Sequence, residues 1–119
     1  MAVALLSDIH SNLEALQVVL QDIKTQGIRE IYCLGDIIGY GPNPVEVVDQ
    51  AMEWDVVVLG NHEEAVVREA YGFNPVARAA VTWTRNLLRP GILSSRAKKE
   101  RWKKISHLPM SHKQEGAFF

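Results

Sequence analysis

The fold is decided near the amino terminus by the stretch Ser7-Asp8-Ile9-His10-Ser11-Asn12. An apolar run over residues 2–6 precedes it, and an amphipathic run over residues 13–23 follows it. This order predicts a buried strand, a tight loop and a helix. Asp8 and His10 lie two residues apart, so in extended backbone their side chains would point the same way. A carboxylate and an imidazole that converge at the carboxyl end of a strand favour a divalent metal ion.

The composition of the chain limits the class of protein it can form. With 119 residues, of which 47% are hydrophobic, the chain is long enough for one small domain with a packed core. The lone cysteine, Cys33, lies in an apolar run and excludes a disulfide framework within the chain. The sequence shows no secretory leader and no apolar run of membrane-spanning length. We therefore expect a cytoplasmic protein with no membrane partner.

Charge is distributed unevenly along the chain, although the net charge is only −1. Acidic side chains greatly outnumber basic ones over residues 1–64, and the reverse holds over residues 65–119. The basic excess is greatest over residues 96–104, where it is typical of a solvated helix face and would also attract a phosphate-rich ligand. Because no nucleic-acid-binding module accompanies this segment, we do not expect nucleic acid as a partner.

Polar clusters follow two further predicted strands as well. Apolar runs over residues 31–34 and 56–59 predict these strands, which end in Gly35-Asp36 and Gly60-Asn61-His62-Glu63. Helical patterns separate the three strands, and a β-α-β-α-β order predicts a parallel sheet. All three polar clusters would then lie at one edge of that sheet.

Helix-capping residues indicate where the helices begin. A Ser, Asn or Asp before an amphipathic run, with Pro or Glu shortly after it, is typical of a helix start. The predicted starts are Ser11 with Glu14, Asn43 with Pro44, Asn74 with Pro75, and Ser94 or Ser95. The last two helices would end near residues 89–91 and at Ser106, and residues 116–119 would begin another strand.

Each polar cluster alone is weak support for a site, since D-x-H is common on surfaces and G-D is common in turns. Together, D-x-H, G-D and G-N-H-E resemble the first three sequence blocks of the calcineurin-like metallophosphoesterases. The resemblance runs through the whole chain, and the motifs are similar to those of the small prokaryotic phosphodiesterase-like branch. It implies an α/β fold, a β-sandwich flanked by helices. This chain would supply the first β-α-β-α-β sheet and the helices that follow it.

The resemblance also implies a role for each matching residue. Asp8 and His10 would hold a first metal ion, Asp36 would bridge two ions, and Asn61 would bind the second. His62 would lie beside the scissile phosphate as the catalytic residue, where it stabilises charge or protonates the leaving oxygen. Two divalent ions, of Mn, Fe, Zn, Ni or Co, would be the cofactors.

Two departures from the family pattern affect this prediction. The serine/threonine phosphatases of the superfamily carry G-D-x-x-D-R-G, and Tyr40 stands at the position of that arginine. This favours a phosphodiester or small phosphorylated substrate, with Tyr40 lining its site or packing in the turn. The later blocks, a lone His and G-H-x-H, are missing, although His107 or His112 could substitute. We therefore expect residues 1–119 to be a domain incomplete at its carboxyl end, with one ion retained.

Two hypotheses about function follow. The first is a metal-dependent phosphoesterase that hydrolyses a phosphodiester or small phosphorylated molecule through a water activated by two metal ions. The alternative is a truncated, non-catalytic α/β module of the same family that acts by binding a partner. A flavodoxin-like nucleotide binder would share the strand order, but no G-x-G-x-x-G or P-loop follows the first strand. An uncovered sheet would also favour homo-oligomers.

Overall fold

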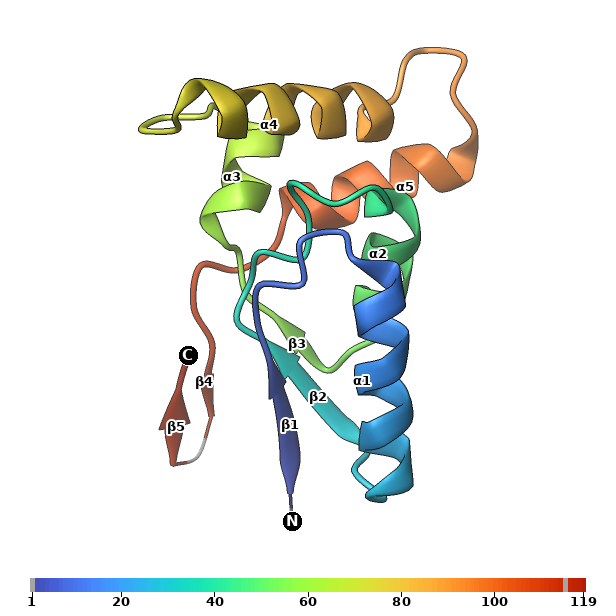
Figure 1. Ribbon diagram of the computed structural model, residues 1–119, viewed down its shortest axis with the longest axis vertical. Coiled ribbons are helices and arrows are strands. Elements are labelled where there is room, and N and C mark those ends of the chain that lie inside the picture. The colour runs from blue at the N-terminus through green and yellow to red at the C-terminus, as the bar shows by residue number, and fades with distance from the viewer. Residues whose placement is uncertain (1, 115) are drawn as a thin grey trace.

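A three-stranded parallel sheet lies at the centre of the amino-terminal half (Figure 1). The structure is a computed structural model that describes residues 2–114 and 116–119. The strands β1 (Val3–Leu6), β2 (Glu30–Cys33) and β3 (Val56–Val57) are ordered β1-β2-β3. Leu6 pairs with Cys33, and Cys33 pairs with Val57, so the three carboxyl ends lie side by side. The predicted α/β class with a parallel sheet is confirmed.

Two helices, α1 (Leu13–Thr25) and α2 (Pro44–Ala51), connect these strands and lie next to one another beside the sheet (Figure 1). The predicted capping residue of α1 was wrong by one position. Asn12 caps the helix by accepting from the Ala15 backbone N–H at 3.0 Å, and Ser11 lies fully buried before it. Gly27 follows the helix with a φ of 72°, a left-handed value that glycine adopts without strain.

Three further helices, α3 (Asn61–Val67), α4 (Pro75–Leu88) and α5 (Arg96–Ser106), form a layer beyond the carboxyl ends of the strands (Figure 1). Two of their predicted caps are confirmed, since Asn74 accepts from Ala77 N and Ser95 accepts from Lys98 N. Side chains from both halves form one core, in which α4 and α5 pack against α2, and α3 packs against α4 and α5.

A short antiparallel hairpin follows α5, formed by β4 (Lys113–Gln114) and β5 (Ala117–Phe118). β5 lies within the strand predicted over residues 116–119. The hairpin does not pair with the three-stranded sheet, and the Phe119 ring packs against Tyr32 with ring centroids 5.5 Å apart. Among the described residues, no helix is both long and apolar enough to cross a membrane.

Cys33 lies at the centre of the core, with none of its surface exposed. Desolvation by burial raises the pKa of its thiol to about 11. The thiol therefore remains protonated at neutral pH and packs as a buried core residue.

Candidate metal centre

The loops that follow β1 and β2 have an unusual backbone. Among the residues that the structure describes, five other than glycine have a positive φ, and all five lie in these loops: Asp8, His10, Ser11, Asp36 and Tyr40, at 56°, 50°, 59°, 57° and 64°. This conformation is costly for residues with a Cβ and collects at functional sites. The prediction of extended backbone at Asp8 and His10 was therefore wrong. The two side chains converge because left-handed turns aim them, after β1 has ended at Leu6.

The two loops bring together a carboxylate, an imidazole and a second carboxylate. Donor atoms of Asp8, His10 and Asp36 all lie within 4.8 Å of one another. The loops are joined along their backbones, since His10 N donates to Asp36 O at 3.0 Å and Ser11 N donates to Ile37 O at 2.8 Å. Figure 1 shows the β1–α1 and β2–α2 loops lying together beyond the strand ends.

The hydrogen bonds of His10 indicate which of its nitrogens is free for an ion. Nδ1 lies 3.0 Å from the Ile38 carbonyl oxygen, which only accepts, so Nδ1 must donate. In the neutral ring, Nε2 then carries a lone pair, and it faces the Asp8 carboxylate at 3.4 Å. Two acceptors that face one another need a cation or a proton between them. A carbonyl bond to the outer nitrogen is also the usual support of a metal-binding histidine.

The carboxylate of Asp8 is suited to bind a cation. The Ser7 hydroxyl donates to Asp8 Oδ2 at 2.5 Å, and this hydrogen bond lowers the pKa of the carboxyl group. Asp8 is therefore ionised at neutral pH. With His10 and Asp36 it forms a mixed carboxylate and imidazole donor set that fits a divalent transition metal.

The predicted substitute ligands do not join this group in the described part of the chain. His107 ends α5, where its Nδ1 bonds to the Lys103 carbonyl at 2.7 Å. The His112 ring packs near Tyr32 and Phe119 instead, with ring centroids 6.0 and 6.3 Å away. Neither histidine therefore replaces the missing ligands within this chain.

The third strand end adds Asn61 and His62, which begin α3 beside Asp36. The His62 backbone N–H donates to Asp36 Oδ1 at 3.0 Å. With its nitrogen facing Asp36, the Asn61 amide donates to both carboxylate oxygens at 2.9 Å. Coordination by Asn61 would require its amide to turn, so that the oxygen faces an ion. The structure thus places Asn61 next to Asp36, where its amide bonds to the carboxylate.

The His62 side chain is enclosed by aromatic rings and by glycine. The ring centroids of His10, Tyr40 and Phe73 lie 4.6, 4.8 and 5.0 Å from that of His62. Burial lowers the pKa of His62, against the opposing effect of Asp36, so the neutral ring predominates at neutral pH. Its Nδ1 has no hydrogen-bond partner in the described part of the chain. A Cβ on Gly39, whose φ is 93°, would lie 2.3 Å from that nitrogen.

The sequence motifs assign no individual role to Glu63, the last residue of the Gly60-Asn61-His62-Glu63 cluster. Its side chain is fully buried and bonds to three backbone N–H groups. Oε1 accepts from Asp36 at 2.7 Å and from Gly60 at 2.9 Å, and Oε2 accepts from Ile38 at 3.2 Å. Desolvation raises the pKa of Glu63 to about 7, although these donors oppose the rise. Glu63 therefore joins the loop after β2 to the loop after β3.

The Arg85 side chain connects α4 to α3. Its guanidinium donates to the carbonyl oxygens of Val66, at 2.7 Å, and of Ala65. These are carbonyls at the end of α3, where a cation satisfies acceptors that lack helical partners. Arg85 therefore fixes α3 against α4.

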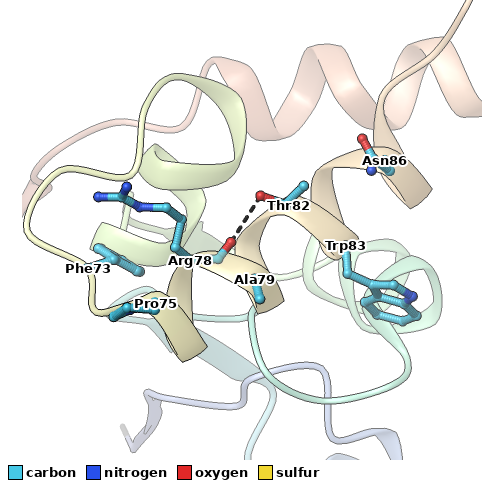
Figure 2. A pocket seen from close by; sticks show the side chains of 7 residues that line it. All are labelled: Phe73, Pro75, Arg78, Ala79, Thr82, Trp83 and Asn86. Atoms are coloured by element: carbon cyan, nitrogen blue, oxygen red, sulfur yellow. Dashed lines mark hydrogen bonds between the residues drawn. The ribbon is translucent and has the colours of Figure 1, made fainter.

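Several cavities lie beside α4, and a large one is not lined by any residue of the donor group. It has a volume of about 700 Å³ and extends from Phe73 along the outer face of α4 to Asn86 (Figure 2). None of its lining residues is a carboxylate, histidine or cysteine. The smaller cavity, of about 270 Å³, is lined by Tyr40, Asn61, His62 and the segment before α4. The smaller cavity lies next to the donor group, because His62 lines it and the His62 ring centroid lies 4.6 Å from that of His10.

A parallel sheet with carboxylate, imidazole and amide groups at the carboxyl ends of its strands defines an α/β protein with a metal-type site. The chain belongs to the calcineurin-like phosphoesterase family, whose sequence model matches residues 1–114. The family resemblance noted in the sequence is thereby confirmed.

Similar proteins extend well beyond the length of this chain. An uncharacterized protein of Methanocaldococcus jannaschii is 47% identical over 90 residues, which are 73% of this chain and 37% of that protein. A metallophosphoesterase from Sphaerobacter thermophilus is 34% identical, with a TM-score of 0.73 over 94% of this chain and 43% of its own. A third, named for a proposed diadenosine tetraphosphatase activity, shares the fold at 20% identity, with a TM-score of 0.63 over 92% and 43%. The chain thus spans less than half the length of each.

Proposed function

We propose that this chain carries the first metal site and the catalytic histidine of a metal-dependent phosphoesterase that acts on a phosphodiester or small phosphorylated molecule. The observation that carries the proposal is the Asp8, His10 and Asp36 donor group, with the His62 ring centroid 4.6 Å from that of His10. The carboxylates would repel an anionic phosphoryl group near these residues unless cations offset their charge. Divalent ions held by the donor group would supply that positive charge.

Each residue has a defined part in the proposed reaction. Asp8 and His10 would hold the first ion, Asp36 would contact both ions, and Asn61 would turn its oxygen toward the second. When bound, such ions supply an activated water and stabilise charge on the phosphoryl oxygens. His62 would donate a hydrogen bond or a proton to the leaving oxygen.

Tyr40 would line the substrate site in this proposal. Its side chain is 56% exposed, and its ring centroid lies 4.8 Å from that of His62. Tyr40→Phe would separate a role of the hydroxyl from a role of the ring, which Tyr40→Ala would remove. If neither variant alters phosphate affinity or turnover of a phosphoester, the lining role is wrong.

The test is the binding of inorganic phosphate to the chain with and without Mn²⁺, measured by calorimetry. We expect binding that requires Mn²⁺ and is about tenfold weaker in His62→Ala, because one hydrogen bond to a charged group is lost. His107→Ala is the matched control and should leave the affinity unchanged. Phosphate affinity that is indifferent to Mn²⁺ and to His62 would favour the non-catalytic module instead.

A further inference from the structure

The cavity beside His62 has an aromatic wall, and two of its three aromatic residues lie outside the sequence motifs. On one side it is lined by Asn61 and His62, at the start of α3. On the other side it is lined by Tyr71, Gly72 and Phe73, from the segment that connects α3 to α4. Both sides enclose about 270 Å³. The residues that would meet a scissile phosphate therefore share one cavity with a segment outside the motifs.

The aromatic side chains differ in how firmly they are held. Phe73 is packed against the core, and its ring centroid lies 5.0 Å from that of His62. Figure 2 shows Phe73 at the amino-terminal end of α4, next to Pro75. Tyr71 is 79% exposed, and a hydrogen bond to Glu69 raises the pKa of its hydroxyl. Tyr40, 56% exposed, completes the aromatic wall. The Phe73 ring is therefore fixed by packing, whereas Tyr40 and Tyr71 are exposed to solvent.

Uncovered aromatic rings bind flat aromatic groups by stacking, and they bind cations through the ring face. The second type of ligand does not fit here. The two divalent ions of the proposed function carry more charge than Asp8 and Asp36 offset, so they would repel a ligand cation. A planar neutral group attached to the phosphate meets no such repulsion. It would also remove aromatic surface from water, which favours binding.

We propose that Tyr40, Tyr71 and Phe73 form a subsite for a planar aromatic group, a nucleobase or an aryl ring, carried by the phosphoester substrate. The inference rests on the proposed function, since the phosphoryl group must lie beside His62. The subsite then discriminates between substrates with and without an aromatic substituent, whereas the donor group recognises only the phosphate.

The experiment compares AMP with ribose 5-phosphate, which differ by the adenine alone. Affinities for the Mn²⁺-loaded chain are measured by calorimetry, with phenyl phosphate and phosphocholine as further probes. We expect AMP to bind about tenfold more tightly than ribose 5-phosphate, as one stacked base permits. AMP binding that exceeds phenyl phosphate binding identifies a nucleobase as the favoured group. The reverse identifies an aryl ring, and both results support the subsite.

Tyr71→Ala should weaken AMP binding about fivefold. It should leave the affinity for ribose 5-phosphate unchanged, which would show that the metal centre is intact. Val76→Ala, at a position that is 78% exposed on α4 and outside the cavity, is the control. Phe73→Leu should weaken AMP in the same sense, with folding checked by circular dichroism. Equal affinities for AMP and ribose 5-phosphate, or tighter phosphocholine, would overturn the subsite alone. A chain that binds no Mn²⁺ would overturn the proposed function, and the subsite with it.

Discussion

The loops at the sheet edge and the helices α4 and α5 are stabilised in different ways. At the sheet edge, the bonds join residues far apart in sequence, as from His10 N to Asp36 O and from Asp36 N to the Glu63 carboxylate. In α4 and α5, the caps join residues three apart, as from Ala77 N to Asn74. The geometry of the site is therefore a property of the assembled fold, whereas the helix ends are local. Substitutions in the two regions should differ accordingly.

The largest difference in stability is expected between alanine variants of two glycines, Gly39 and Gly91. Gly39→Ala places a Cβ 2.3 Å from His62 Nδ1 at a φ of 93°, so both strain and overlap result. We expect a loss of about 3 kcal/mol in the free energy of unfolding, measured by urea denaturation. Gly91→Ala is the matched control, because a Cβ there meets only Ser94 Oγ, at 3.9 Å. Gly91→Ala should change the free energy of unfolding by no more than about 0.5 kcal/mol. Similar values for both variants would contradict the contrast between the regions.

The second comparison uses two neighbouring glutamates. Glu63→Gln replaces one buried acceptor oxygen with an amino group that cannot accept from the backbone N–H groups around it. We expect destabilisation of about 2 kcal/mol and weaker Mn²⁺ binding, because the loop that carries Asp36 loses a support. Glu64→Gln, at an exposed position in the same helical turn, should change neither quantity. Mn²⁺ affinity and stability that are unchanged in Glu63→Gln would show that Glu63 does not position the loop.

Arg85 and Arg78 provide a smaller contrast within α4. Arg85→Met removes the donors to the carbonyls at the end of α3. We expect it to lower the free energy of unfolding, measured by thermal denaturation, by about 1.5 kcal/mol. Arg78→Met changes an exposed side chain and should cost about 0.5 kcal/mol or less. Equal losses in the two variants would mean that the hydrogen bonds from Arg85 to α3 contribute little to the free energy of unfolding.

The smallest effect is expected at the ion pair between α5 and α2. Arg101 donates to both Asp49 oxygens, at 2.7 and 3.0 Å, on a partly exposed surface. Asp49→Asn should lower the free energy of unfolding by less than about 1 kcal/mol, and the difference should shrink in 1 M salt. A larger loss that is independent of salt would show that this pair matters as much as the bonds of the sheet edge.

The sequence predicted local features of the structure better than the geometry of the site. The caps at Asn74 and Ser95 followed from residue type and spacing, and the parallel sheet followed from the alternation of strands and helices. The left-handed backbone at Asp8 and His10 could not be predicted in this way, because contacts with the loop after β2 impose it.

Two side chains show the same limitation. Glu63 bonds to residues up to 27 positions away, and Arg85 bonds to Ala65, 20 positions away. Neither bond has a local sequence signal, so neither could be predicted from residue type and spacing. The shift of the cap from Ser11 to Asn12 has a similar cause, since Ser11 N donates to Ile37 in the neighbouring loop. The candidate site residues were proposed from their residue types, whereas the residues that support them were identified only from the structure.

The most direct test of the account is a calorimetric titration of the chain with Mn²⁺, alongside Asp36→Asn and Asp49→Asn. The account predicts that the unchanged chain and Asp49→Asn bind at least one ion per chain, through Asp8, His10 and Asp36. Asp36→Asn should lower the affinity by at least about tenfold, since it removes a charged ligand. A chain that binds no Mn²⁺, or an Asp36→Asn variant that binds it equally well, would contradict the assignment of the metal centre.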